Sequence, residues 1–333
     1  MPLPAQPAGV PAAEAMAPFA LIQEPLEAVE RQFTAELATA TPGIAAIAEY
    51  LHSGGGKRLR PALLLLAAEF SGARGPQIIA LATVVEMIHA ATLIHDDVID
   101  DAATRRGRPS ANARWGARAC VLAGDWLYMQ AFSIALRQRH FGILEELIQL
   151  TEAMVEGELQ QQEMAGTVVT RTQHLDLIEA KTARLFAVCC KLGALAVGRE
   201  AEATVLECFG RELGLAFQMV DDVLDFTASE DWLGKPVGND LREGKMTLPA
   251  LYAYEQATAT ERERIQMVMR EGYATVGLAE IRELLGRSGA LERALAEARV
   301  HAAAARDLLA AYPPSPWRDA LLALPALAVE RTR

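Results

Sequence analysis

Apolar residues recur at helical spacing in one segment after another of this 333-residue chain, and this pattern limits the folds open to it. The spacing predicts helices over residues 22–37, 42–51, 62–70, 77–101, 111–140, 142–164, 175–197 and 201–227, then Ala- and Leu-rich helices to the C-terminus. Val-rich runs of alternating polarity, which are typical of strands, do not occur in the sequence. The sequence therefore predicts an all-α fold without a sheet.

The chain shows no linker that would divide residues 19–333, and we predict that they form a single domain. Residues 1–18 are rich in Pro and Ala and lack a basic start before an apolar core, so we expect a flexible tail and not a signal peptide. Arg184 and Lys191 interrupt the best candidate for a membrane span, which needs about 18 apolar residues. The four cysteines show no metal-binding or disulfide spacing. We therefore expect a cytoplasmic protein without a transmembrane segment.

Two acidic clusters lie among aliphatic residues in predicted helices. Their members are Asp96, Asp97 and Asp100 in the first cluster, and Asp221, Asp222 and Asp225 in the second. Residues four apart share a helix face, so each cluster offers several carboxylates to one region. The first cluster ends its helix, where the helix dipole disfavours acids and favours bound cations. Oxygen ligands without His or Cys suit Mg²⁺, which commonly completes its shell with phosphate oxygens. We expect several magnesium ions shared by both clusters and a phosphorylated substrate.

Basic residues beside glycines provide groups that can bind a diphosphate directly. Lys57 and Arg60 follow three consecutive glycines, and Arg105 and Arg106 follow the first acidic cluster. His89 precedes Asp96 by seven residues, two turns away on the same face, and can hydrogen-bond an anionic ligand. Taken singly, these features also fit solvated basic loops and a core or surface histidine. The glycine- and charge-rich segment 234–249 is a candidate lid.

The charge balance excludes one class of partner. A net charge of -11 and a pI near 5.2 argue against a general nucleic-acid binder, because phosphate backbones are held by clustered Lys and Arg. No Ser/His/Asp or Cys/His arrangement predicts a side-chain nucleophile. We interpret the acidic face formed by Glu152, Glu156, Glu158 and Glu163 as solvated.

Taken together, the motifs resemble those of the trans (head-to-tail) polyprenyl diphosphate synthases, from about residue 22 to the C-terminus. The resemblance rests on residues 55–61, on the first cluster with Arg105-Arg106-Gly107, on Phe217-Gln218 before the second cluster, and on Gly234-Lys235 with Gly244-Lys245. It implies a bundle of antiparallel helices around a deep central cavity, magnesium between the two clusters, and a homodimer.

The resemblance also implies a reaction and roles for single residues. Isopentenyl diphosphate would be bound by Lys57, Arg60, His89 and Arg106. An allylic diphosphate would be bound by the metal-bound aspartates with Arg105, Lys181 and Lys235, while Lys245 would also contact substrate and Thr182 and Gln218 would line the reacting centre. Departure of the diphosphate would leave an allylic cation, which the double bond of isopentenyl diphosphate attacks before a proton is lost.

Product length is expected to depend on the residues one turn before Asp96, which are Ala91 and Thr92. Short-chain members of the family carry bulky aromatics there, so this chain resembles the long-chain members. A tunnel floor at Met87, Met129 or Phe132 is the alternative. A geranylgeranyl- or farnesyl-type synthase is the nearest rival function, and a class I terpene cyclase, a non-catalytic partner subunit and an acidic helical scaffold also stay open.

Overall fold

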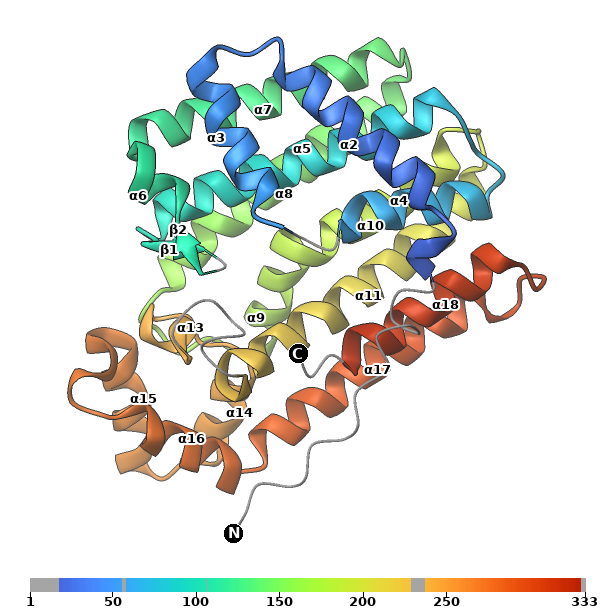
Figure 1. Ribbon diagram of the computed structural model, residues 1–333. Helices are drawn as coiled ribbons and strands as arrows, with labels where there is room; N and C mark the ends of the chain where they lie inside the picture. Colours follow the sequence, from blue (N-terminus) through green and yellow to red (C-terminus); the bar gives the residue numbers. More distant parts are fainter. Residues whose placement is uncertain (1–17, 56–57, 106, 229–236, 331–333) are drawn as a thin grey trace.

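The computed structural model describes residues 18–55, 58–105, 107–228 and 237–330, and nearly all of their regular structure is helical (Figure 1). The first half contains α2 (Gln23–Leu37), α3 (Pro42–Ser53), α4 (Leu59–Phe70), α5 (Pro76–Ile99), α6 (Ala111–Trp115), α7 (Ala117–Arg137) and α8 (Phe141–Met164). The second half contains α9 (Arg171–Ile178), η1 (Glu179–Ala183), α10 (Arg184–Leu195), α11 (Glu200–Thr227), α13 (Asn239–Arg242), α14 (Leu248–Gln256), α15 (Ala259–Glu271), η2 (Gly272–Ala274), α16 (Leu278–Arg287), α17 (Ala290–Ala310) and α18 (Pro316–Val329). The predicted all-α fold is confirmed.

Three local differences from the predicted elements have clear causes. The predicted helix over 111–140 is divided into α6 and α7, because Gly116 adopts a positive φ of 79° between them. The expectation of no strand at all was wrong by one short hairpin, in which β1 (Thr104–Arg105) pairs antiparallel with β2 (Arg108–Pro109). The segment predicted as one helix over 175–197 contains a π-helical turn, η1, between α9 and α10.

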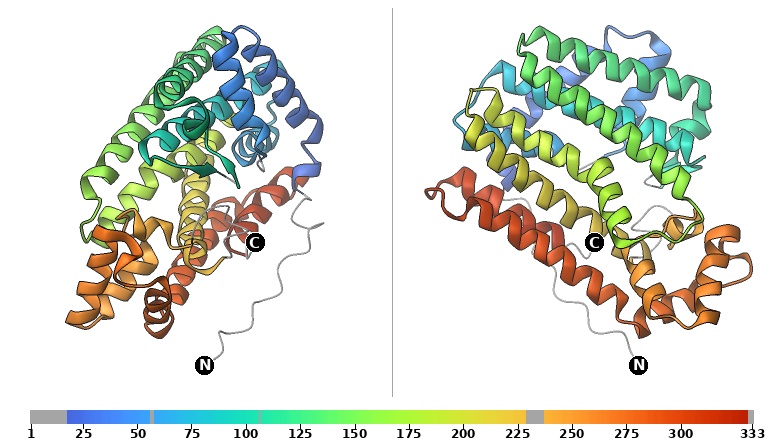
Figure 2. Two further views of the ribbon diagram at one scale, coloured as in Figure 1. Left: turned by 60° about the vertical axis from the view of Figure 1, so that its left-hand side comes forward. Right: turned by 180° about the vertical axis from the view of Figure 1, so that it is seen from behind.

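Helices α5 and α11 run through the interior of the bundle, and the other helices pack around them (Figures 1 and 2). Helix α5 packs against α2, α4 and α7, and it is buried nearly all round because its apolar residues occupy every face. Helix α11 packs against α10 on one side and α17 on the other. Its first half contributes Leu206 and Phe209 to one apolar cluster, and its second half contributes Met219 and Val223 to another. The two clusters are therefore joined through α11.

Glycines allow α11 to approach the helix before it very closely. A Cβ atom on Gly210 would lie 2.5 Å from the carbonyl oxygen of Phe186, and one on Gly214 would lie 2.5 Å from the Cα of Ala183. A larger residue at either position would separate the two helices. This close approach brings the side chains of η1 within reach of those on α11.

Two helices in the described part of the chain, α5 and α7, are long and apolar enough to cross a membrane by length and composition. The sequence led us to expect none. The apolar window of α5 is 72% buried inside the protein, as in a core helix, whereas that of α7 is 39% buried. Length and composition alone do not separate a core helix from a membrane span.

Candidate active site

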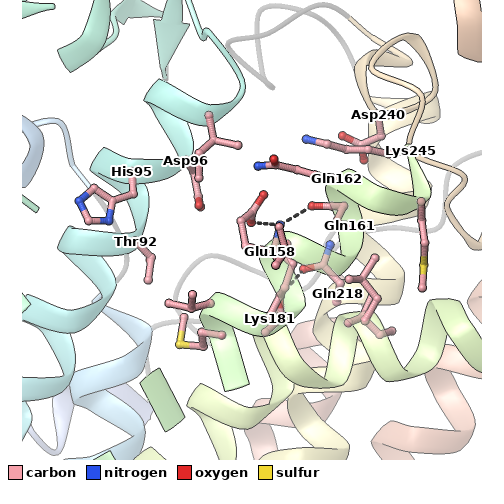
Figure 3. Close-up of a pocket in the computed structure, with 18 of the residues that line it drawn as sticks. Thr92, His95, Asp96, Glu158, Gln161, Gln162, Lys181, Gln218, Asp240 and Lys245 are labelled. Atoms are coloured by element: carbon pink, nitrogen blue, oxygen red, sulfur yellow. Dashed lines mark hydrogen bonds and ion pairs between the residues drawn. The ribbon is translucent and has the colours of Figure 1, made fainter. Parts of the chain in front are cut away.

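A cavity of about 590 Å³ lies between α5, α8, α9, η1 and α11, and the segment before α14 lines its edge (Figure 3). Each acidic cluster contributes one side chain to its wall, Asp96 from α5 and Asp222 from α11. Apolar side chains cover another part, among them Met154, Val155 and Leu159 on α8. The predicted central cavity is therefore present, with polar groups gathered at one side of an apolar space.

The three acids of the first cluster face different surroundings. Asp96 points into the cavity (Figure 3), and burial raises the pKa of its carboxyl to about 6, although Lys181 acts in the opposite direction. Asp97 is fully buried outside the cavity, where Arg105 donates from Nε to its Oδ1 over 2.7 Å. Asp100 accepts from Nζ of Lys245 at 2.9 Å. Adjacent residues diverge by about 100° around a helix, so the side chain of Asp97 leaves the helix in a different direction from that of Asp96.

Arg105 was expected to bind the allylic diphosphate, but it pairs with Asp97 and does not line the main cavity. It lines a smaller cavity of about 30 Å³, together with Gly54, Leu93 and Arg108. Asp97, one of the six acids expected to hold magnesium, holds the β1–β2 hairpin through Arg105 in this structure.

Lys245, in the segment between α13 and α14, contacts the first cluster. Its ammonium lies 2.9 Å from Asp100 and 2.8 Å from Glu243, and its side chain is only 18% exposed. Burial acts to lower the pKa of Lys245, but attraction to Asp100 and Glu243 outweighs burial and raises it. Lys245 therefore keeps its positive charge beside the first cluster. Asp240 from the same segment also lines the cavity, a position that the sequence pattern did not single out.

The second cluster is more deeply buried than the first. Asp222 is 2% exposed and accepts from Nε2 of Gln218 at 3.0 Å. Asp225 is 1% exposed, and its Oδ2 accepts from the backbone N–H of Asp240 at 3.2 Å, at the start of α13. Asp221 is half-buried. Asp225 therefore holds the loop that begins α13 in this structure.

The π-helical turn η1 carries Lys181, expected to bind the allylic diphosphate, and Thr182, expected at the reacting centre. Single π-helical turns re-aim side chains within a helix and occur frequently at functional sites. Thr182 donates from Oγ1 to Oε1 of Gln218 at 2.8 Å, and Lys181 contacts Glu158 and Gln161 on α8 (Figure 3). All of these side chains line the cavity.

Glu158 corrects a prediction. We expected it on a solvated acidic face, but its side chain is 16% exposed and pairs with Lys181. Glu158 lies four residues after the apolar Met154, and this spacing places both on the helix face that lines the cavity. Because a glutamate resembles its solvated neighbours in sequence, only the packing of α8 against η1 reveals the difference.

Two further groups expected to bind a diphosphate come from α4 and α5. Arg60 and His89 line the cavity, whereas Lys57, Arg106 and Lys235 lie outside the described residues. The neighbouring Arg58 was not predicted to matter. It has a positive φ of 46° at the start of α4, donates from Nε to Glu30 at 2.6 Å and from Nη1 to the buried Glu86 at 3.2 Å. These contacts fix the end of the glycine-rich loop that precedes Arg60.

The two residues expected to govern product length differ in their exposure to the cavity. Thr92 lines it, and its hydroxyl donates to the carbonyl oxygen of His89 at 2.8 Å. Ala91 is fully buried in the apolar core and is not part of the described wall. Of the alternative floor residues, Met129 is 62% exposed and Met87 is fully buried. Thr92 is therefore the better placed of the pair.

Among the described residues, no three His, Cys, Asp or Glu side chains lie close enough together to hold one ion by themselves. The expected magnesium ions would therefore also need phosphate oxygens of the substrate. The donor set nevertheless fits magnesium. Carboxylates of both clusters border one cavity, and Mg²⁺ is usually bound by one or two carboxylates together with substrate phosphates. The burial that raises the pKa of Asp96 also favours a cation beside it.

The chain is similar in sequence and in fold to known polyprenyl synthases. Residues 41–284 match the model of the polyprenyl synthetase family. The octaprenyl diphosphate synthase of Haemophilus influenzae is 38% identical over 308 residues, which cover 92% of this chain and 94% of that protein. A polyprenyl synthase from Caulobacter crescentus, solved with calcium and isoprenyl diphosphate, superposes with a TM-score of 0.92 at 36% identity and covers 98% of this chain and 100% of that one.

A decaprenyl diphosphate synthase from Rhodobacter capsulatus has the same fold, with a TM-score of 0.89 at 34% identity over 97% of this chain and 100% of that one. The similarity spans the cavity, both aspartate clusters and nearly the whole bundle. The chain belongs to the polyprenyl synthetase family and is an enzyme that transfers prenyl groups.

Proposed function

We propose that the chain condenses isopentenyl diphosphate head-to-tail with an allylic diphosphate, in repeated magnesium-dependent cycles, to give a medium or long all-trans polyprenyl diphosphate. The observation that carries the proposal is the cavity, whose wall combines acids and lysines with Arg60 and His89 and with apolar side chains. Two anionic groups and a hydrocarbon chain need these three environments. The related octaprenyl and decaprenyl synthases support a long product.

For the allylic diphosphate we assign Asp96 and Asp100, with Asp221 from the second cluster, as the groups that would hold magnesium. Asp96 and Asp100 share a helix face, whereas Asp97, Asp222 and Asp225 are almost fully buried and each accepts a hydrogen bond from a protein group on one oxygen. Magnesium, when bound, would neutralise charge on the departing diphosphate. Lys181 and Lys245 are placed to take up the same charge directly.

For the second diphosphate we assign Arg60 and His89, together with Lys57 and Arg106, which lie outside the described residues. Holding two substrates side by side lowers the entropic cost of their reaction. Thr182 and Gln218 line the same cavity. Their oxygens would stabilise the allylic cation, since they carry partial negative charge and need no rearrangement when the cation forms.

We also propose that the enzyme works as a homodimer built on α7 and α8. Apolar side chains are exposed at seven-residue intervals on both helices: Leu122, Met129 and Leu136 on α7, and Phe141, Ile148 and Val155 on α8. A stripe with this period is suited to packing against other helices, and large exposed apolar patches mark interaction sites. Val155 and Leu159 are 58% and 59% exposed yet also line the cavity, so a second copy would cover its apolar side.

The decisive experiment for the activity is incubation of the purified protein with magnesium, isopentenyl diphosphate and geranyl, farnesyl or geranylgeranyl diphosphate, followed by chromatographic sizing of the products. We expect long polyprenyl diphosphates and no cyclic hydrocarbon. A cyclised product from a single allylic substrate would identify a terpene cyclase instead. Products that stop at farnesyl or geranylgeranyl length would identify a short-chain synthase.

The assembly and its setting have separate tests. Light scattering after size-exclusion chromatography should give twice the monomer mass, and Met129→Glu with Leu122→Glu should shift the mass toward the monomer.

We propose that residues 19–333 form one domain, since α11 belongs to both apolar clusters, and that the protein lies in the cytoplasm. Limited proteolysis that separates two stable halves would contradict the single domain, and cell fractionation tests the location.

A further inference from the structure

A buried histidine touches the second aspartate cluster and has no part in the assignments above. Nε2 of His174 lies 3.0 Å from Oδ2 of Asp222, and the two side chains are only 4% and 2% exposed. Their contact is an ion pair by distance, and neither atom makes a hydrogen bond of regular geometry with any described residue. A carboxylate buried in this way requires donors on both oxygens, and Gln218 already occupies Oδ1.

The contact ends a chain of side chains that crosses three elements. His174 on α9 faces Asp222 on α11, Asp222 accepts from Gln218, and Gln218 accepts from Thr182 on η1. Helix α9 is fixed at its start by a capping box between Thr170 and Gln173, immediately before His174. All four of these side chains line the cavity. The direction in which each donates its hydrogen bond therefore decides whether a substrate meets donors or acceptors.

The orientation of each group follows from the one before it. An ionised carboxylate only accepts hydrogen bonds, so Gln218 must present its amide N–H to Asp222, and its Oε1 therefore faces Thr182. Thr182 then donates its only hydroxyl proton to Gln218, which leaves the lone pairs of its oxygen available. If the carboxylate of Asp222 were free to rotate, the amide of Gln218 would lose the contact that fixes its direction.

We propose that His174 is a positioning residue for prenyl transfer: by holding Oδ2 of Asp222, it fixes Gln218 and Thr182 with their oxygens toward the developing allylic cation. The inference deepens the proposed function and rests on it. No bond to His174 forms or breaks in the reaction. Residues that orient catalytic groups through a second contact typically affect activity by about 10- to 100-fold when removed.

The test compares two substitutions at His174 with a histidine of the same kind elsewhere. His174→Gln keeps an N–H donor near the position of Nε2, whereas His174→Leu removes it at similar volume. The control is His301→Leu, because Nδ1 of His301 lies 2.7 Å from Glu212 in a half-buried pair outside the cavity wall. Each variant is measured for thermal stability, for kcat and for KM with both diphosphates.

A second readout needs no turnover. Calorimetry gives the affinity of each variant for two allylic diphosphate analogues in the presence of magnesium. One carries an ammonium in place of the carbon that becomes cationic. The other, called the neutral analogue, has no charge at that position and has sulfur in place of the bridging oxygen. We expect His174→Leu to lower kcat about 10- to 100-fold with KM within about twofold. It should weaken the ammonium analogue about tenfold more than the neutral one. His174→Gln should recover most of both losses, and His301→Leu should change neither.

Equal losses for the two analogues, or equal behaviour of His174→Leu and His174→Gln, would overturn the positioning role and leave His174 as a packing residue. If His174→Leu does not fold, His174→Phe supplies the larger apolar replacement and the Gln variant the donor. Failure of the wild-type enzyme to make polyprenyl products would count against the proposed function instead. The binding comparison would still decide the role of His174, because it is independent of turnover.

Discussion

The two aspartate clusters have the same spacing in the sequence, yet they meet different partners in the fold. The first lies at the C-terminal end of α5, where Arg105 and Lys245 hold two of its acids and Asp96 faces the cavity with a raised pKa. The second lies within α11, where an amide, an imidazole and a backbone N–H surround two almost fully buried acids. The first is therefore partnered by full charges and the second by donors in fixed positions.

This difference suggests a division of labour between two motifs of one pattern. Charges on long side chains such as Lys245 can exchange partners when a diphosphate and cations arrive, whereas the donors around Asp222 are packed between helices. A charged group in a binding site often lowers the stability of the free protein, because its charge is partly buried before the ligand binds. The two clusters should consequently respond in opposite ways to neutralisation.

The largest effect is expected from Asp96→Ala. Removing the carboxylate that points into the cavity should lower kcat by about 100- to 1,000-fold, the scale seen when one preorganised electrostatic contact is lost. Asp101→Ala is the matched control, since Asp101 is exposed and accepts a hydrogen bond from Asn112 on the surface. Steady-state kinetics with magnesium measures both. Near-normal turnover of Asp96→Ala would end the assignment of the first cluster to the leaving diphosphate.

Lys245→Met should have the next largest effect. It removes the charge that contacts Asp100 and Glu243 at the cavity edge, and we expect kcat/KM for the allylic diphosphate to fall by about 10- to 100-fold. Lys191 offers a control, because it also lies between two glutamates, Glu146 and Glu207, but outside the cavity wall. Lys191→Met should lower thermal stability without lowering kcat/KM. Equal kinetic losses in both variants would remove the special role of Lys245.

Neutralising one acid in each cluster tests the comparison directly. The pKa of Asp96 is raised from 3.8 to about 6, so the folded protein binds this proton more tightly than the unfolded chain does. The charged form is therefore disfavoured in the folded state above pH 6, and the cost disappears as the pH falls toward 4. Asp96→Asn should raise the free energy of unfolding at pH 7.5 by up to about 3 kcal/mol, and by much less near pH 4.

Asp222→Asn should do the reverse. It weakens the contacts from Gln218 and His174 and brings an N–H group against buried donors, so we expect a loss of about 1–3 kcal/mol. Urea unfolding with a chelator present measures both variants without bound metal. A gain in stability from both substitutions, or a loss from both, would break the proposed contrast between the clusters.

The smallest effect on rate concerns the residue one turn before each cluster. That residue is Thr92 for the first cluster, on the cavity wall, and Phe217 for the second, whose ring packs 5.1 Å from that of Phe186. Thr92→Phe should shorten the product while leaving turnover within about tenfold, because it narrows an apolar space and touches no charge. Chromatographic sizing of products reads the change.

Two controls accompany Thr92→Phe. Phe217→Ala should leave the product length unchanged, since Phe217 is not part of the described cavity wall. Ala91→Phe should mainly destabilise the protein, by about 1–3 kcal/mol, because Ala91 is fully buried in the core. A shortened product from Ala91→Phe with normal stability would show that the growing chain passes along that face of α5 instead.

Most of the fold could be predicted from the sequence, because helical periodicity is a local signal. The bounds expected for residues 22–37 and 201–227 lie within one residue of α2 and α11. Glycines were harder to interpret. Gly116 ends a helix, whereas Gly210 and Gly214 lie inside one and allow close packing, and composition does not distinguish the two uses.

The candidate site was predicted in part, for a related reason. Spacing grouped Asp96, Asp97 and Asp100 on one helix, but it could not show that Arg105 of the hairpin pairs with Asp97. Glu158, Arg58 and His174 were missed, because each acts through a partner distant in sequence. Residue type alone leaves such side chains indistinguishable from solvated or core ones.

By itself, the sequence determined the all-α class, the two acidic clusters and the basic loops, since these depend on residue type and on spacing along one helix. Only the tertiary structure decided which acid meets which partner. Lys245 reaches Asp100 across 145 residues, and a π-helical turn, for which the sequence shows no periodic signal, aims Thr182 at Gln218. The physical reason is that helical periodicity fixes the face on which a side chain lies, whereas the packing of one helix on another fixes what that face meets.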